Sequence, residues 1–367
     1  MLITPLAELQ LSHRNSLLVA TPDGQRIVVA SQSKVLVLDE NLMTLFEYDI
    51  GYPIDNLTIS PNGQMLAITN EEGQLLVIQI DGKVLFEEIH PTGSKMYCNG
   101  CLFSNDGTQL WNIVEVENYQ VQVQYRETEK WNVLKSTVLQ SGDSFSYFSF
   151  IPHPENKVLA AWEAAGQDGS WVHWIWEDKG EIKVLEIPEL ENKIPPEFHP
   201  AGGEFLVVDN LSDLRCYRFP DCHLMGTATL ELEEDYFQYY MCYLSDERAI
   251  IKSENGRLLI VNLDSLKVID EVILTGYEPR PTNELFPSLA DEKTLCGNLS
   301  SFKRVGKNRI VSIHNNFYGK QQSTLLIWGD NLLFGECSQP SPMAPYTAQL
   351  IQSITNANVQ ESKGKTE

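Results

Sequence analysis

The stretch ATPDGQRIVVAS, residues 20–31, recurs in similar form as TISPNGQMLAIT, residues 58–69. In both stretches a proline is followed by Asp or Asn, then by Gly, and then by a run of apolar residues. Proline fixes φ, Asp and Asn tolerate a tight turn, and Gly supplies positive φ, so each stretch predicts a hairpin turn that leads into a strand. The repetition indicates a structural unit that the chain uses more than once.

Seven positions along the chain correspond to the proline of this turn: Pro22, Pro61, Asn105, Pro154, Pro200, Ser245 and Val305. A strand-like run precedes each turn, an apolar run follows it, a second run ends near an acidic residue, and a third run usually follows the next turn. Each unit is therefore predicted to form four antiparallel strands. Units of about 45 residues match the period of a four-stranded propeller blade.

Radial packing explains why such a unit would recur. Several of the apolar runs are apolar on both faces, so a single sheet would leave both faces and its edges bare. Sheets packed around a ring bury those faces against their neighbours and leave only short edges. The sequence therefore predicts an all-β, seven-bladed β-propeller.

The turns TPDG and SPNG, and the strand that ends in Trp328, Gly329 and Asp330, resemble repeats of the WD40 and YVTN-like propeller superfamily. The resemblance extends over nearly all of residues 5–337. No unit has the Gly-His pair of a true WD40 repeat, and only the last unit approaches its Trp-Asp ending. The resemblance thus implies the fold and no particular function.

We expect one propeller domain over residues 1–337 and a polar, disordered tail over residues 338–367. Two segments compete to complete the last blade. LAELQLS, residues 6–12, alternates like a strand, and NLLFGECS, residues 331–338, could fill the same place.

Charge and composition limit the partners. Fifty acidic against 27 basic side chains give a formal net charge of −23, which disfavours nucleic acid and anionic membranes. The tightest basic group, Lys303, Arg304, Lys307 and Arg309, looks too short to reverse that field. No apolar run is long enough to span a membrane, the amino terminus does not look like a secretory signal, and seven cysteines lack framework spacing. We expect a cytoplasmic protein.

Catalytic and metal signatures are missing from the sequence, so we expect no catalytic residues, metal or cofactor. Cys98 and Cys101 have zinc-like spacing, but no second pair accompanies them. His153 and His199 both precede the proline of a repeat turn, which ties their recurrence to the architecture. His173 lies in an alternating strand and is expected to be a satisfied, partly buried histidine.

Loops that join one blade to the next converge on one mouth of a propeller channel, and here they carry aromatic and charged residues typical of protein-binding surfaces. Carboxylates beside aromatics in ELEEDYFQYY, residues 231–240, suit Lys or Arg side chains of a partner. The loop at residues 314–322 should reach the same mouth. The predicted binding residues are Tyr52, Asp55, Tyr97, Phe145, Glu231, Glu233, Glu234, Asp235, Tyr236, Tyr239, Tyr277, Phe317 and Tyr318.

These residues favour a non-catalytic interaction scaffold that binds a protein or peptide, expected to be basic, at the channel mouth and rim loops. A first alternative is a propeller hydrolase or lactonase acting on a small polar substrate, with Asp55, Asp143 and His90 near the mouth. A second alternative is a structural subunit of a larger assembly. The same loop aromatics could also simply pack the rim.

Overall fold

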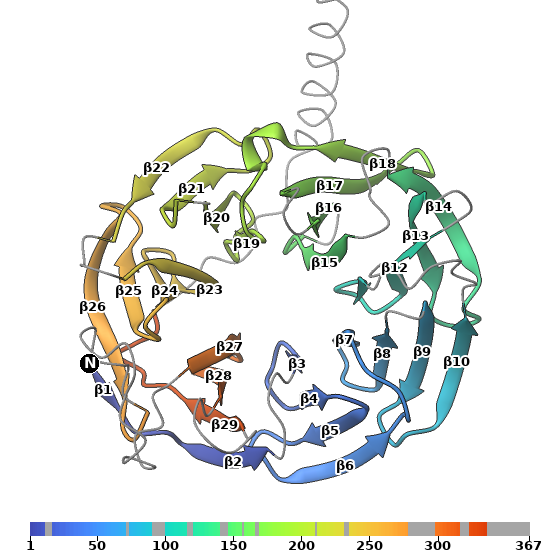
Figure 1. The fold of residues 1–367 in the computed structure, drawn as a ribbon, viewed down its shortest axis with the longest axis horizontal. Helices are drawn as coiled ribbons and strands as arrows, with labels where there is room; N and C mark the ends of the chain where they lie inside the picture. The colour runs from blue at the N-terminus through green and yellow to red at the C-terminus, as the bar shows by residue number, and fades with distance from the viewer. Residues whose placement is uncertain are drawn as a thin grey trace, which may run out of the picture.

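The computed structural model describes residues 1–11, 17–70, 73–89, 100–115, 120–139, 146–155, 158–165, 169–209, 211–230, 235–277, 298–315 and 323–335. In these residues the regular structure consists of β-strands and one 3₁₀ turn, Pro188–Leu190. The strands form seven sheets arranged as blades around a central axis (Figure 1). The seven-bladed propeller predicted from the repeat is confirmed.

The first four blades each contain four consecutive strands. Blade one is β3 (Leu17–Ala20), β4 (Ile27–Ser31), β5 (Lys34–Leu38) and β6 (Thr44–Asp49), and blade two is β7 (Asn56–Ile59), β8 (Met65–Thr69), β9 (Gln74–Gln79) and β10 (Val84–Ile89). Blade three is β11 (Cys101–Phe103), β12 (Gln109–Glu115), β13 (Val121–Glu127) and β14 (Val133–Leu139). Blade four is β15 (Tyr147–Pro152), β16 (Val158–Ala164), β17 (Ser170–Asp178) and β18 (Glu181–Glu186).

The remaining blades include the amino terminus. Blade five is β19 (Glu197–Phe198), β20 (Glu204–Val208), β21 (Leu214–Arg218) and β22 (Leu224–Ala228). Blade six is β23 (Phe237–Ser245), β24 (Arg248–Ser253), β25 (Leu258–Asn262) and β26 (Lys267–Leu274), extended by β1 (Leu2–Ile3). Blade seven is β27 (Asn298–Val305), β28 (Arg309–Asn315), β29 (Ser323–Trp328) and β2 (Ala7–Leu11).

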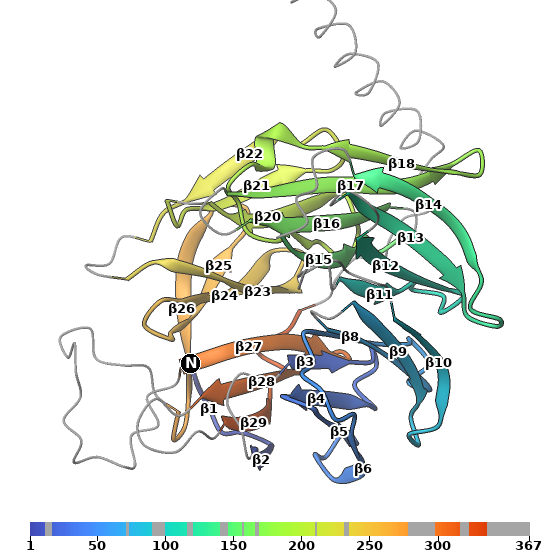
Figure 2. The ribbon, with the colours of Figure 1, turned by 45° about the vertical axis from the view of Figure 1, so that its right-hand side comes forward.

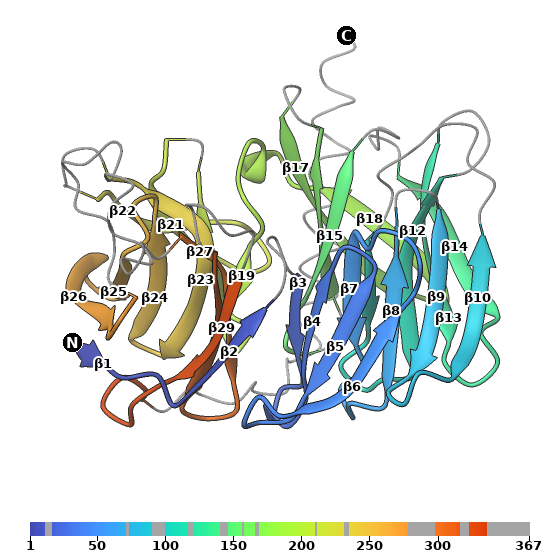
Figure 3. The same cartoon turned by 60° about the horizontal axis from the view of Figure 1, so that its bottom comes forward.

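Strand direction divides the disc into two faces. The first strand of each blade lies nearest the axis, and the strands run between the faces (Figures 1 and 3). The first and second strands of every blade are antiparallel, and the turns between them all lie on one face, which we call the hairpin face. The connections between blades lie on the other face, which we call the loop face. The seven sequence positions that defined the repeat all fall on the hairpin face.

Apolar side chains fill all seven boundaries between blades. Ile27 of blade one, for example, packs in one cluster with Val311 and Ile327 of blade seven. The middle strands are buried on both faces, as in β8 and β29, whereas the outer strands are largely exposed. A blade therefore needs both neighbours to bury its apolar surface.

The amino-terminal strand β2 closes the ring. It pairs antiparallel with β29, with Leu9 opposite Leu325, and the Leu6 amide donates to the Ile327 carbonyl at 2.7 Å. The first three strands of blade seven thus come from the far end of the chain, and β27 lies beside β3 of blade one in Figure 2. The competing segment forms a turn over residues 331–333, with Leu333 and Phe334 buried. Sequence left this choice open because both segments are apolar and short.

The hairpin turns share a hydrogen-bond pattern that explains their sequence. In blade one the Thr21 hydroxyl donates to the Asp23 carboxylate at 2.6 Å, and Asp23 accepts from the Gln25 amide at 3.0 Å. The same geometry recurs in blades two and three, where Ser60 pairs with Asn62 and Ser104 with Asp106. These short side chains satisfy turn amides, which is why the turn recurs with Ser or Thr before the Pro or Asn.

Replacing Leu11 by alanine tests the closure. Leu11 is buried in the cluster between blades seven and one, so Leu11→Ala is expected to lower the free energy of unfolding by about 2 kcal/mol or more. The neighbouring Gln10 is exposed and makes one side-chain hydrogen bond, to the Thr324 hydroxyl at 2.9 Å, so Gln10→Ala is expected to cost only about 1 kcal/mol and serves as the control. Urea unfolding followed by tryptophan fluorescence measures both. Equal, small effects for the two variants would mean that β2 does not close the ring in solution.

Candidate functional site

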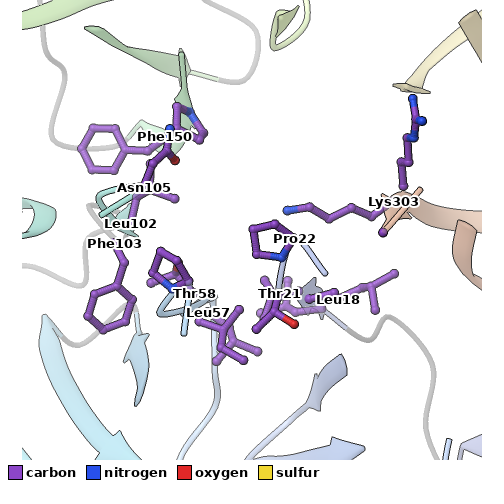
Figure 4. A pocket seen from close by; sticks show the side chains of 18 of the residues that line it. Leu18, Thr21, Pro22, Leu57, Thr58, Leu102, Phe103, Asn105, Phe150 and Lys303 are labelled. Carbon is purple, nitrogen blue, oxygen red and sulfur yellow. The ribbon is translucent and has the colours of Figure 1, made fainter. Parts of the chain in front are cut away.

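The central channel holds a cavity with a volume of about 1250 Å³. Its lining comes from six of the seven blades: parts of residues 17–22, 56–61, 101–105, 147–152 and 303–308, together with Pro200, Asn331, Phe334 and Gly335. The first strands of the blades form its wall, and the hairpin turns surround one end (Figure 4). We call that end the hairpin mouth.

The lining combines apolar and polar side chains. Leu18 and Leu102 supply partly exposed apolar surface, and the buried side chains of Leu57, Phe103 and Phe150 lie behind it (Figure 4). Amide side chains at Asn56, Asn105, Asn308 and Asn331 and hydroxyls at Thr58, Tyr147 and Ser149 add hydrogen-bonding groups. Such a lining can contact both the backbone and the side chains of a polypeptide.

Polar contacts from one hairpin turn to the next fix the hairpin mouth. Asn105 of blade three donates to the His153 carbonyl at 3.1 Å, and the His153 ring bonds the Gly202 carbonyl of blade five at 2.8 Å. The Gly306 amide of blade seven donates to the Pro22 carbonyl of blade one at 2.8 Å. The mouth is therefore held by its neighbours as well as by each blade.

The two histidines of the repeat turns have the structural role that their recurrence indicated. The Nδ1 atoms of His153 and His199 accept from the backbone amides two residues onward, at 3.2 and 3.0 Å, where other blades use Ser or Thr. Burial lowers the pKa of both rings. His199 also lies 3.3 Å from the Asp246 carboxylate of blade six. Both histidines thus belong to the set of hairpin turns that contact one another around the hairpin mouth, which we call the hairpin ring.

A glycine pair in blade five tests this ring. Gly202 has φ +79°, and a Cβ there would meet the His153 ring at 2.7 Å, so Gly202→Ala is expected to cost about 1–3 kcal/mol of unfolding free energy. At the adjacent Gly203 a Cβ would meet nothing within 4 Å, so Gly203→Ala is expected to be close to neutral. Thermal unfolding of both variants is the measurement. A neutral Gly202→Ala would contradict a fixed contact between these turns.

Three cationic residues, Lys303, Arg304 and Lys307, belong to the cavity lining. Arg304 donates to the Tyr243 carbonyl and to the Lys307 carbonyl, each at 2.9 Å, and its guanidinium lies 5.1 Å from the Phe334 ring centre. The exposed Lys303 side chain reaches from β27 into the open space, with its amine toward Pro22 (Figure 4). The sequence shows this basic group, but its position at the channel is visible only in the fold.

The pKa values of Lys303 and of Glu197 in β19 are both shifted, and each charge acts on the other. Desolvation lowers the pKa of the Lys303 amine, and the Glu197 charge partly opposes that shift. Desolvation raises the pKa of Glu197 to about 7, and Lys303 acts against the rise. Near neutral pH the glutamate is therefore only partly charged.

At the loop face, two predicted binding residues occupy different places. Tyr52 is half-buried near Gln74 and Glu87 at the outer part of blade two, and burial raises its pKa to about 12. Asp55 lies where the chain enters blade two, and its charge contributes to the raised pKa of Tyr147 in the channel wall. Of the pair, Asp55 is the residue near the channel.

The predicted acidic and aromatic segment is divided. Asp235 is fully buried, accepts from the Tyr236 and Asn255 amides at 3.0 and 3.1 Å, and lies 3.7 Å from Arg257. Tyr236 is 54% exposed and is available at the surface. Tyr277 is 7% exposed, so it and Asp235 offer a partner almost no surface in this structure.

The other predicted binding residues lie outside the described residues: Tyr97, Phe145, Glu231, Glu233, Glu234, Phe317 and Tyr318, with the side chain of Tyr239. The same holds for His90 and Asp143 of the hydrolase alternative. These assignments stay predictions.

Two buried polar chains hold strands together inside blades. In blade four Glu163 accepts from the Ser146 hydroxyl at 2.8 Å and lies 3.0 Å from the His173 ring, all three being buried. In blade seven the Trp328 indole donates to the Ser312 hydroxyl at 2.8 Å, and that hydroxyl lies 2.9 Å from His314 Nε2. The expectation for His173, a satisfied histidine in a strand, is thereby met with deeper burial than predicted.

His314 predicts a pH dependence of stability. Burial, with a smaller effect of the nearby Lys252 charge, lowers its pKa from 6.5 to about 3. Between these two pKa values the unfolded chain binds a proton at His314 and the folded chain does not. The contribution of neutral His314 to the free energy of unfolding is therefore complete above pH 6.5 and is lost as the pH falls toward 3. The limiting slope is about 1.4 kcal/mol per pH unit.

Urea unfolding at a series of pH values checks this. The His314→Gln variant should lose stability less steeply than the wild type as the pH falls, whereas substitution of the exposed His223 by Gln should leave the slope unchanged. Parallel wild-type and His314→Gln profiles would contradict a neutral His314 in the fold.

Cys98 lies outside the described residues, and Cys101 is a buried thiol whose pKa is raised to about 12 by burial. Cys216, Cys222 and Cys242 are also buried, as small apolar residues would be. Within the described ranges no group of three or more His, Cys, Asp or Glu side chains could hold a metal ion. No helix in those ranges is long and apolar enough to cross a bilayer.

Comparison with known proteins places the fold. No protein-family model and no curated protein matches the sequence. The β-propeller domain of Cps50 (Swd1) from Myceliophteria thermophila superposes with a TM-score of 0.61 over 88% of this chain and 100% of that domain, at 13% sequence identity. The chain resembles WD40-like propellers in fold. Because 1626 solved chains match, the likeness carries no specific function.

Proposed function

We propose that the protein is a non-catalytic interaction scaffold that holds a segment of a partner protein in its central channel. The observation that carries the proposal is the channel cavity of about 1250 Å³. Pockets for small molecules usually measure about 300–1,000 Å³, so this cavity exceeds the need of a small substrate.

The walls support a peptide occupant. The lining combines apolar side chains such as Leu18 and Leu102 with amides and hydroxyls, which suits a chain that carries both apolar groups and backbone polar groups. The hairpin ring holds its end of the wall in place, so binding would require little ordering of this part of the protein.

The overall charge supports a protein partner rather than nucleic acid. With a formal net charge of −23, the surface repels phosphate backbones at long range and attracts basic segments. A basic partner at the loop face, next to Asp55, Tyr236 and the acidic run at residues 231–234, is part of this proposal, as is a cytoplasmic location.

Channel-blocking variants test the proposal. Ser149→Trp places a large ring in the channel wall, Asn331→Trp places one at the hairpin mouth, and Leu211→Trp places the same ring on exposed surface as the control. Each protein is immobilised in folded form, checked by circular dichroism and thermal unfolding, and used to capture proteins from native extract. We expect a set of proteins that wild type and Leu211→Trp retain and the blocked variants lose.

A fourth variant, with Glu231, Glu233 and Glu234 all changed to Lys, reports on the loop face. Loss of the same partners would assign part of the contact to that face. If wild type, blocked and control proteins all retain one identical set, the channel is not the binding site and the proposal is wrong.

A further inference from the structure

The channel has a charge opposite to that of the protein. Its lining includes Lys303, Arg304 and Lys307, and among the residues that the structure describes it contains no Asp or Glu, although acidic residues outnumber basic ones by 50 to 27 in the whole chain. At physiological ionic strength charges are screened beyond about 8 Å, so a ligand in the cavity experiences mainly these nearby cations rather than the distant surface acids. Low-dielectric walls focus that local field further.

Lys303 is the central cation of this lining. Its side chain is exposed and points into the cavity, and in the described structure it has no ion pair within 4 Å. Glu197 is its acidic neighbour, and this glutamate is only partly charged near pH 7. Glu197 therefore compensates the Lys303 charge only in part.

The other two cations have additional roles. Arg304 is fixed by the Tyr243 and Lys307 carbonyls, so its charge is held in place at the wall. Lys307 also borders a second groove of about 580 Å³, which includes the carboxylates of Asp23, Glu40 and Asp330. A ligand of the channel can thus contact both Lys303 and Lys307, and the nearby acids reduce the effect of the Lys307 charge.

We infer that the hairpin mouth of the channel binds an acidic peptide segment, whose Asp or Glu carboxylate pairs with the Lys303 amine while its apolar side chains contact the partly exposed Leu18 and Leu102 of the wall. This inference rests on the proposed function and names the chemistry of the segment inside the channel. The basic partner surface expected at the loop face is a separate contact.

A peptide fits better than nucleic acid for two reasons. A polyanion would carry many charges past the acidic outer surface, whereas a peptide carries a few carboxylates that can all lie within the locally positive region. The wall also has partly exposed aliphatic side chains, such as Leu18 and Leu102, which match apolar side chains of a peptide.

The test uses three short peptides that share one scaffold of Gly, Ala, Leu and Phe and have Glu, Gln or Lys at every other position. Each bears an uncharged dye, and fluorescence anisotropy measures its affinity for the full-length protein. We expect the Glu peptide to bind at least about tenfold more tightly than the Gln peptide and the Lys peptide to bind weakest, with affinity falling as salt is added.

Three variants locate the contact. Lys303→Gln should lower the affinity for the Glu peptide by about tenfold and leave the affinity for the Gln peptide unchanged. Lys307→Gln should lower the affinity for the Glu peptide by a smaller factor. Lys83→Gln removes an equal charge from the exposed turn between β9 and β10, at the rim of the same face, and should change nothing.

The outcomes separate this inference from the proposed function. If the Gln or Lys peptide binds as tightly as the Glu peptide and Ser149→Trp abolishes that binding, the channel holds peptides but the acidic preference is wrong. Failure of the Glu peptide to bind, or equal effects of Lys303→Gln and Lys83→Gln, overturns the inference. The proposed scaffold function is then tested separately by the capture of proteins from native extract. Lys303-dependent binding of a single-stranded oligonucleotide, without binding of the Glu peptide, also overturns it.

Discussion

The structure depends on the need of every blade for two neighbours. The middle strands are buried on both faces, so no blade can satisfy its apolar surface alone, and an open ring would leave one face on each end blade uncovered. The strand β2 resolves this, because it joins the amino terminus to β29 and completes the blade that packs on blade one. The cluster that contains Leu11, Ile27 and Val311 is therefore where the two ends of the propeller chain meet.

Ring closure also determines where polar groups gather. Turns that are more than 40 residues apart in sequence become neighbours on the hairpin face, and side chains such as Asn105 and His153 bond the backbone of the next turn. Each turn is built by its own short side chains, and its position is then fixed by the adjacent blade. The channel wall is consequently a property of the closed ring and is present in no single repeat.

This distinction explains what the sequence could and could not predict. Turn chemistry and apolar runs are local, so the seven blades, their four antiparallel strands and the structural role of His153 and His199 were within reach of the sequence. The parallel strand β1, which makes blade six five-stranded, was not predicted. The closing strand was undecided, because Leu6–Ser12 and Asn331–Ser338 have similar apolar content and only the register with β29 separates them.

The site was harder to predict for the same reason. The aromatic and acidic residues of the connecting loops were chosen by residue type, yet Asp235 is used inside the fold to bind backbone amides and Tyr277 is buried against His314. Residue type does not reveal burial, which depends on packing between blades. The channel lining draws a few residues from each of six blades, so no stretch of sequence contains the pattern.

The basic group around Lys303 shows how geometry changes the meaning of a charge count. In sequence, four cations in seven residues are small beside a net charge of −23, and averaging over the chain makes them negligible. In the fold, β27 instead brings Lys303 to the wall of the channel, where no described acidic residue belongs to the lining. Electrostatic interaction falls with distance and with screening by salt, so the few charges that line an enclosure dominate what enters it. An acidic protein can in this way present a cationic channel.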